Sequence, residues 1–287
     1  MGLHRADHVA FYHTATLRSL LDDFSFEFVE GTVLQLEGSW SRHYQSSLHG
    51  ENTFLYSYCK MLDLGSFIEA ELDLLDLLRE EDPPFDGVLA YSSGAALAAQ
   101  VFLRHERHRK SLPQQANLSP LFKFAVFCNA VTPGRLFKLE DQGVGAEPSN
   151  DTMLKEEAMQ FIDIISGFRM QAAPQMAPQI AKRRLMDEEV VAKSFKAMTL
   201  SDGTPFLTDG IHCVAPFDPR HGPELSIPTL HIRDLEEPRQ LGLGMLEICD
   251  ARLAREYHHS QGHEFPRGYS AMKEIAHLIK DVADAAS

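Results

Sequence analysis

The feature that most constrains this chain is a short apolar run that ends in a serine-containing turn. Phe85 to Tyr91 (FDGVLAY) has the length and composition of a buried strand, and Ala95 to His108 is alanine-rich, as in a helix packed on a sheet. Ser92-Ser93-Gly94 joins them, so a strand passes sharply into a helix. A second continuous apolar run, Lys123 to Val131, follows. Strand, helix and strand at these lengths predict a parallel βαβ unit.

The turn itself has the pattern of a nucleophile elbow. In small-x-Ser-x-Gly the serine stands at a strained apex, so the residues two positions away on either side must be small. Ala90 and Gly94 meet that condition about Ser92, whereas an elbow centred on Ser93 would put the ring of Tyr91 at the crowded position. Ser92 is therefore the predicted nucleophile. The alternative is an ordinary turn in which the serine caps the helix.

The remaining elements extend the α/β pattern. Alternating or apolar runs predict strands at 26–29, 228–233 and 256–258. Helices are predicted from Ser66, with Glu69 completing a capping box, up to the Pro83-Pro84 pair, and then at 240–253 and 270–285. The fold class predicted is α/β, with a mostly parallel central sheet and helices on both faces.

Residues 132–226 form a long insertion between predicted core strands. They begin with loop-like sequence up to Asn150, show helical patterns at 151–165 and 175–198, and continue as loops to Pro223. Because long ordered excursions are usually functional, we expect a cap or lid over the active site; the alternative is a solvated excursion. The core then comprises residues 1–131 and 227–287.

A serine nucleophile needs a base, and the base needs an acid to orient it. His263 lies in Gly262-His263-Glu264-Phe265-Pro266, between a predicted strand and the last helix. His258 and His259 are nearby competitors, but they fall within the predicted strand. The three histidines resemble a metal cluster, yet their spacing lacks a convincing carboxylate or cysteine partner. We therefore predict His263 as the base and no metal.

The acid is expected after the strand that ends near Arg233. Asp234, Glu236 and Glu237 all stand there, and either Asp234 or Glu237 has the reach to meet a histidine. In hydrolases of this type the chain order is serine, acid, histidine, which these positions satisfy. The residues alone leave the choice open.

Charge and cysteine content narrow the function classes. The formal net charge is −14, which argues against nucleic acid because phosphate binding needs a basic surface. The four cysteines include no CxxC pair. Without a secretory signal pattern or an apolar run long enough to span a bilayer, we expect a cytoplasmic protein with no membrane association. No cofactor is expected, and the oligomeric state stays open.

These motifs together resemble the fungal serine hydrolases of the FSH type, a branch of the α/β-hydrolases. The likeness rests on residues 85–98, whose family pattern is F-D-G-V-L-G-F-S-Q-G-A-A-L-A, and on Ile227 to Ile232. Gly262 to Arg267 and Phe26 to Gly31 add to it. The resemblance implies a serine esterase or thioesterase without cofactors. It also implies a small acyl substrate, including a carrier-bound polyketide released or trimmed in fungal secondary metabolism.

The resemblance also assigns roles around the nucleophile. The family acid lies in a loop patterned G-x-x-D, which places the acid of this chain at Glu237, with Asp234 in reserve. One oxyanion-hole amide would come from Ser93, and the second from the Arg5–Ala6 region. The family's L-H-G-x-G-x-N motif is altered there, because Leu3-His4 is followed by Arg5. Losing one such donor typically costs on the order of 100- to 1,000-fold in rate.

That alteration keeps two alternatives to hydrolysis open. In the first, an internal nucleophile of the substrate replaces water, giving acyl transfer or cyclisation inside a site from which the insertion excludes water. In the second, the hydrolase fold is catalytically degenerate and serves as a binding protein.

Overall fold

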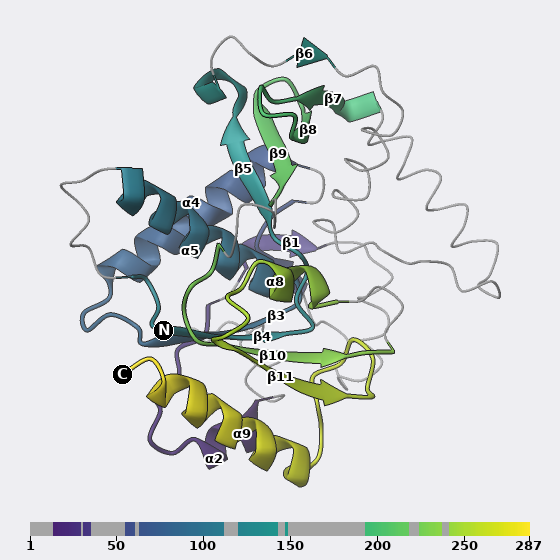
Figure 1. The fold of residues 1–287 in the computed structure, drawn as a ribbon. Coiled ribbons are helices and arrows are strands. Elements are labelled where there is room, and N and C mark those ends of the chain that lie inside the picture. Colours follow the sequence, from purple (N-terminus) through teal and green to yellow (C-terminus); the bar gives the residue numbers. More distant parts are fainter. Residues whose placement is uncertain are drawn as a thin grey trace.

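The computed structural model describes residues 14–29, 31–35, 55–60, 63–111, 120–142, 147–148, 193–217, 224–236 and 241–287. Its core is a four-stranded sheet in the order β11-β10-β4-β3, in which every neighbouring pair is parallel (Figure 1). The strands are β3 (Gly87–Tyr91), β4 (Phe124–Cys128), β10 (Thr229–Asp234) and β11 (Ala254–His259). Four predicted strands therefore assemble into one parallel sheet.

Helices cover both faces of this sheet (Figure 1). On one face lie α4 (Leu64–Glu80), α5 (Ser93–Ser111) and the short α8 (Leu243–Glu247), which share a buried cluster with Phe127 of β4. On the other face α2 (Ala15–Leu20) and α9 (Tyr269–Asp284) pack on a cluster that includes Val126. Side chains of β4 thus alternate between two apolar layers, which explains its unbroken apolar sequence. The predicted fold class is confirmed.

The predicted insertion contains a second, wholly antiparallel sheet. Its strands run in the order β5-β9-β8-β7-β6. They are β5 (Gly134–Lys138), β9 (His212–Pro216), β8 (Pro205–Thr208), β7 (Lys196–Thr199) and β6 (Glu147–Pro148), with a 3₁₀ turn at Leu139–Gln142. One face of this sheet packs on α4 through a cluster that includes Phe67, Leu136 and Val214.

This sheet corrects the secondary structure predicted for the insertion. The loop-like stretch before Asn150 holds β5 and β6, the helical pattern of 175–198 ends in β7, and the expected loops after it hold β8 and β9. The physical reason is hairpin geometry: Gly203 (φ +85°) and Gly210 (φ +103°) each follow an aspartate in a tight connection. The pattern at 151–165 lies outside the described residues, and the cap assignment stays a prediction.

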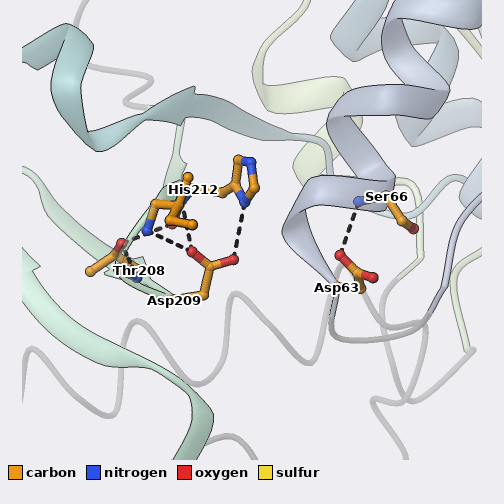
Figure 2. A network of polar contacts seen from close by, with 7 residues as sticks. Asp63, Ser66, Thr208, Asp209 and His212 are labelled. Atoms are coloured by element: carbon orange, nitrogen blue, oxygen red, sulfur yellow. Dashed lines mark hydrogen bonds and ion pairs between the residues drawn. The ribbon is translucent and has the colours of Figure 1, made fainter.

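Figure 2 shows how the antiparallel sheet meets the start of α4. Asp209 Oδ2 lies 3.2 Å from Nδ1 of His212, whose ring stands over Gly65 so closely that a Cβ there would be 3.1 Å from Cε1. Asp63 caps α4, because its Oδ1 accepts the Ser66 amide at 3.0 Å. The predicted capping box beginning at Ser66 is therefore wrong by one turn.

Three other element predictions need correction. Residues 26–29 form no strand in the described structure, and the nearest strand is β1 (Val33–Gln35), which pairs antiparallel with β2 (Leu55–Ser57). The run at 123–131 is a strand only to Cys128, because Asn129 turns into the left-handed region with φ +44°. The helix predicted at 240–253 is only α8. Within the described ranges, no helix has both the length and the apolar character to cross a bilayer.

Candidate active site

The elbow predicted at Ser92 has the expected backbone. Ser92 follows β3 directly and has φ +54°, a left-handed conformation that costs a residue with a side chain about 1–2 kcal/mol. Neighbouring main chain holds it there: its amide donates to the Cys128 carbonyl at 3.0 Å, and its carbonyl accepts from Ala95 and Val131, both at 3.1 Å. A strained serine fixed between a strand and a helix is the arrangement that exposes a nucleophile.

The structure also explains why a small residue, Gly94, stands two positions after Ser92. A Cβ at Gly94 would lie 3.3 Å from Cε2 of Tyr58, whose hydroxyl donates to the Val29 carbonyl at 3.1 Å. The Tyr58 ring therefore packs over the first turn of α5. A larger residue at 94 would push it away.

The structure brings the predicted base to the predicted nucleophile. Ser92 Oγ lies 3.0 Å from Nε2 of His263, although 171 positions separate the two residues. His263 stands on the loop between β11 and α9, as the sequence predicted. Both residues are half-buried, so the pair is shielded yet reachable. This distance suits proton transfer from a hydroxyl to an imidazole.

The Asp234 side chain contacts the main chain of the loop that carries His263. Asp234 ends β10 and is 6% exposed, and its Oδ2 accepts the amide of Gly262 at 2.6 Å. Its Oδ1 accepts the Glu236 amide at 2.9 Å. Each carboxylate oxygen thus accepts a backbone amide, and one of these amides belongs to the loop that carries His263. Glu237, the preferred acid, lies outside the described residues.

Known proteins with similar sequences show which family the chain belongs to. The profile of the family described as Serine hydrolase (FSH1) matches residues 1–275. The chain belongs to this family. It is a serine hydrolase, as the sequence predicted.

Curated relatives of this FSH1 hydrolase are fungal. Hydrolase FUB4 of Gibberella moniliformis is 24% identical over 216 residues, which cover 74% of this chain and 72% of the relative. Esterase alnB of Emericella nidulans is 27% identical over 216 residues, covering 70% of this chain and 67% of the relative. The match to a solved thioesterase domain from the curacin biosynthetic pathway covers 80% of this chain and 75% of the thioesterase domain, at 11% identity. Its TM-score of 0.30 is too low for the likeness to carry an argument.

The FSH1 hydrolase offers one of the predicted oxyanion donors in the described structure. Ser93 is exposed and is the first residue of α5, where main-chain amides have no acceptor within the helix. The positive end of the α5 dipole adds to that amide's attraction for negative charge. Arg5 and Ala6, the other predicted donors, lie outside the described residues.

The competing histidines take other positions in the FSH1 hydrolase. His258 Nε2 lies 3.1 Å from Glu256 Oε2, and His259 Nδ1 accepts the Gln261 amide at 3.2 Å. Burial lowers the pKa of His259, a shift that the charge of Asp234 opposes. Neither histidine is bonded to Ser92. In the part of the chain that the structure describes, no group of three His, Cys, Asp or Glu side chains could hold a metal ion.

Two residues of this FSH1 site were missed at the sequence level. In the sequence Tyr91 is notable only for the bulk of its ring, but in the structure its hydroxyl donates to the His263 carbonyl. Asn129 falls within the predicted strand 123–131, but in the structure it follows β4 and its Nδ2 donates to the Glu264 carbonyl at 3.0 Å. The signal for Asn129 was present, because a lone amide directly after a buried strand marks the edge where parallel strands end.

Proposed function

We propose that this FSH1 hydrolase cleaves an ester or thioester through an acyl-enzyme formed on Ser92. His263 serves as general base and acid, and Glu237 orients its imidazole. Family membership establishes the hydrolase class, and this residue-level mechanism is the step beyond it.

One observation carries the proposal: the 3.0 Å separation of Ser92 Oγ and His263 Nε2 at a serine with φ +54°. An ordinary helix-capping serine has extended backbone and bonds the amides of its own helix. Ser92 instead has a left-handed backbone and directs its hydroxyl to a histidine from the far end of the chain. The combination favours a nucleophile over the capping alternative.

The reaction then follows in two balanced halves. Ser92 Oγ attacks the acyl carbonyl while its proton passes to Nε2 of His263, and the carbonyl oxygen becomes an oxyanion facing the Ser93 amide. When the tetrahedral intermediate collapses, the C–O or C–S bond breaks and His263 protonates the leaving alcohol or thiol. Water then attacks the acyl-enzyme while His263 takes its proton, the bond between the acyl carbon and Oγ breaks, and His263 returns the proton to Ser92 Oγ. The products are the free acid and regenerated Ser92.

Glu237 is the proposed acid, with Asp234 in a different role. Asp234 accepts main-chain amides on both oxygens, one of them from the loop that carries His263, and we assign it to holding that loop. Glu237 follows within three residues of Asp234 and can replace aspartate in this role. The second oxyanion donor is proposed to come from Arg5 or Ala6.

The proposed substrate is a small acyl compound, including a polyketide bound to a carrier, in fungal secondary metabolism. Resemblance to the FSH-type hydrolases motivates this class. The proposed location is the cytoplasm: all four cysteines are free, as suits a reducing compartment. We propose no nucleic-acid and no membrane partner, consistent with the net charge of −14.

A fluorophosphonate probe tests the nucleophile. We expect stoichiometric labelling at Ser92, found by peptide mass spectrometry, none in Ser92→Ala, and strongly slowed labelling in His263→Ala. A folded protein that the probe does not label would overturn the mechanism.

The acid needs its own pair of variants. With a p-nitrophenyl ester, Glu237→Gln should lower kcat by on the order of 10⁴-fold with little change in KM, as loss of a triad acid does. The matched variant Asp234→Asn should cost less, because its loss acts on the loop. The reverse ranking would make Asp234 the acid.

Two experiments test the remaining alternatives, which are cyclisation and a catalytically degenerate binding protein. A thioester substrate carrying an internal hydroxyl gives free acid if water deacylates the enzyme and a lactone if cyclisation prevails. Unchanged biological function in Ser92→Ala would favour the degenerate binding protein.

A further inference from the structure

We propose that Tyr91 and Asn129 are positioning residues for the base His263, an inference that rests on the proposed function. They act through the main chain of the loop that carries the imidazole. The loop needs such support because residues 260–267 belong to no helix or strand, so no ladder of backbone hydrogen bonds fixes its conformation.

Tyr91 contacts His263 in two ways. Its hydroxyl donates to the His263 carbonyl, and its ring centroid lies 5.2 Å from that of the imidazole with the planes at 30°. Tyr91 is the last residue of β3 and immediately precedes Ser92. The end of β3 therefore positions the nucleophile Ser92 directly and orients the base His263 through Tyr91.

Asn129 fixes the next carbonyl along the loop. Its Nδ2 donates to Glu264 O at 3.0 Å, and its own amide donates to the Ile232 carbonyl at 2.8 Å. The side chain is 1% exposed and its φ is +44°, a conformation that asparagine tolerates better than most residues with a side chain. The buried side-chain amide of Asn129 is therefore directed at the loop that carries His263.

The anchors hold main-chain groups of three consecutive residues in the loop. Asp234 holds the Gly262 amide, Tyr91 the His263 carbonyl and Asn129 the Glu264 carbonyl. They stand at the carboxyl ends of three neighbouring strands, β10, β3 and β4. These bonds hold the main chain before and after His263, which restricts where the imidazole starts from the backbone. Since a displacement of about 1 Å can cost 10²-fold in rate, these bonds matter for turnover.

Two variants remove one anchor each with little other change. Tyr91→Phe deletes the hydroxyl and keeps the ring, and Asn129→Gly deletes the amide and permits the positive φ. With p-nitrophenyl butyrate, each should lower kcat by on the order of tenfold and leave KM within about twofold. Tyr257→Phe is the matched control, because Tyr257 lies on β11 in the α9-side core and its hydroxyl makes no hydrogen bond in the described structure. It should retain wild-type kcat.

A double-mutant cycle with His263→Ala distinguishes positioning from a general structural role. If Tyr91 acts through the imidazole, Tyr91→Phe slows fluorophosphonate labelling in the wild-type background but leaves the residual rate of His263→Ala unchanged within about twofold. An equal loss in both backgrounds, or no loss in either, overturns the proposal. If Tyr91→Phe does not fold, as judged by its thermal transition, Asn129→Gly carries the same cycle.

Failure of the proposed function looks different. If the wild-type protein neither labels at Ser92 nor turns over the ester, the hydrolytic mechanism fails. If it does both and the single variants match it, only the positioning inference fails.

Discussion

Glu71 accepts a charge-assisted hydrogen bond from Nε of Arg104 at 2.6 Å, inside the packing of α4 against α5. Glu71 is 2% exposed, whereas the Arg104 side chain is 32% exposed and also donates to the Leu136 carbonyl of β5 at 3.4 Å. The pair therefore joins the parallel core to the antiparallel sheet. Burial raises the pKa of Glu71 to about 7, and the attraction of Arg104 offsets only part of that rise.

The stability of the protein should depend on pH through Glu71. Between the usual pKa of 4.5 and the folded value of about 7, the folded state holds a proton that the unfolded state has released. Stability contributed by this group is therefore lost as pH rises through that window. Glu71→Gln does not titrate, so its free energy of unfolding should improve relative to wild type by about 1–3 kcal/mol between about pH 5 and about pH 8. Urea unfolding measures this, with the exposed Glu69→Gln as control.

His231 should give the opposite dependence. It is 1% exposed, with Nε2 3.0 Å from Thr229 Oγ1, and burial lowers its pKa to about 4. Between about pH 4 and pH 6.5 the unfolded state binds the extra proton, so stability is lost as pH falls. His231→Gln should lose less stability than wild type between about pH 7 and about pH 5. The exposed His277→Gln should follow wild type; if His231→Gln does so as well, burial of His231 has no such effect.

The strained backbone of Ser92 should lower the stability of the protein while serving its activity. Its left-handed backbone strains any residue with a Cβ, and glycine removes that strain. Ser92→Gly and Ser92→Ala both lose the hydroxyl and the contact with His263, so comparing them isolates the backbone. We expect both to be inactive and the glycine variant to be more stable by about 1 kcal/mol. Equal thermal midpoints would mean that the elbow is unstrained.

The strands β3, β4 and β10 of the parallel core were predictable because each is a short run of strand-forming residues followed by a loop, whereas β11 at the edge of the sheet is largely exposed. Tyr91-Ser92-Ser93-Gly94 and Gly262-His263-Glu264 mark loops at the carboxyl ends of strands, where this fold collects its chemistry. The Ser92–His263 pairing followed from that rule and from chain order. The sequence marks Asn129 as a polar residue at a strand end, but it does not show that Tyr91 and Asn129 bond to the loop, because main-chain acceptors leave no residue-type signature.

The antiparallel sheet was harder to predict for a different reason. Its strands are two to five residues long, and β7 begins two residues after a helical turn at 193–194. Over so few residues an apolar pattern fits either period. The stronger signals were the turns Asp202-Gly203 and Asp209-Gly210, each flanked by strand-forming residues. Weighing these dipeptides above the helical pattern would have predicted the β7-β8-β9 meander.

Gly87 at the start of β3 should be intolerant of any side chain. It pairs in register with Phe124 of β4, and a Cβ on Gly87 would fall well inside contact distance of the phenyl ring. Phe124 is 7% exposed and packs among the α9-side core residues, so its ring has little room to move. Gly87→Ala should therefore lower the free energy of unfolding by about 1–3 kcal/mol through overpacking.

A cycle with Phe124→Leu tests that cause. The smaller side chain clears the space, so Gly87→Ala should cost clearly less in the Phe124→Leu background than in wild type, measured by urea unfolding at fixed pH. Equal costs in both backgrounds would place the penalty in the backbone of β3 instead. Because Gly87 lies four residues before the end of the strand that carries Ser92, the single variant should also report on the elbow: a displaced β3 would slow fluorophosphonate labelling along with the loss of stability.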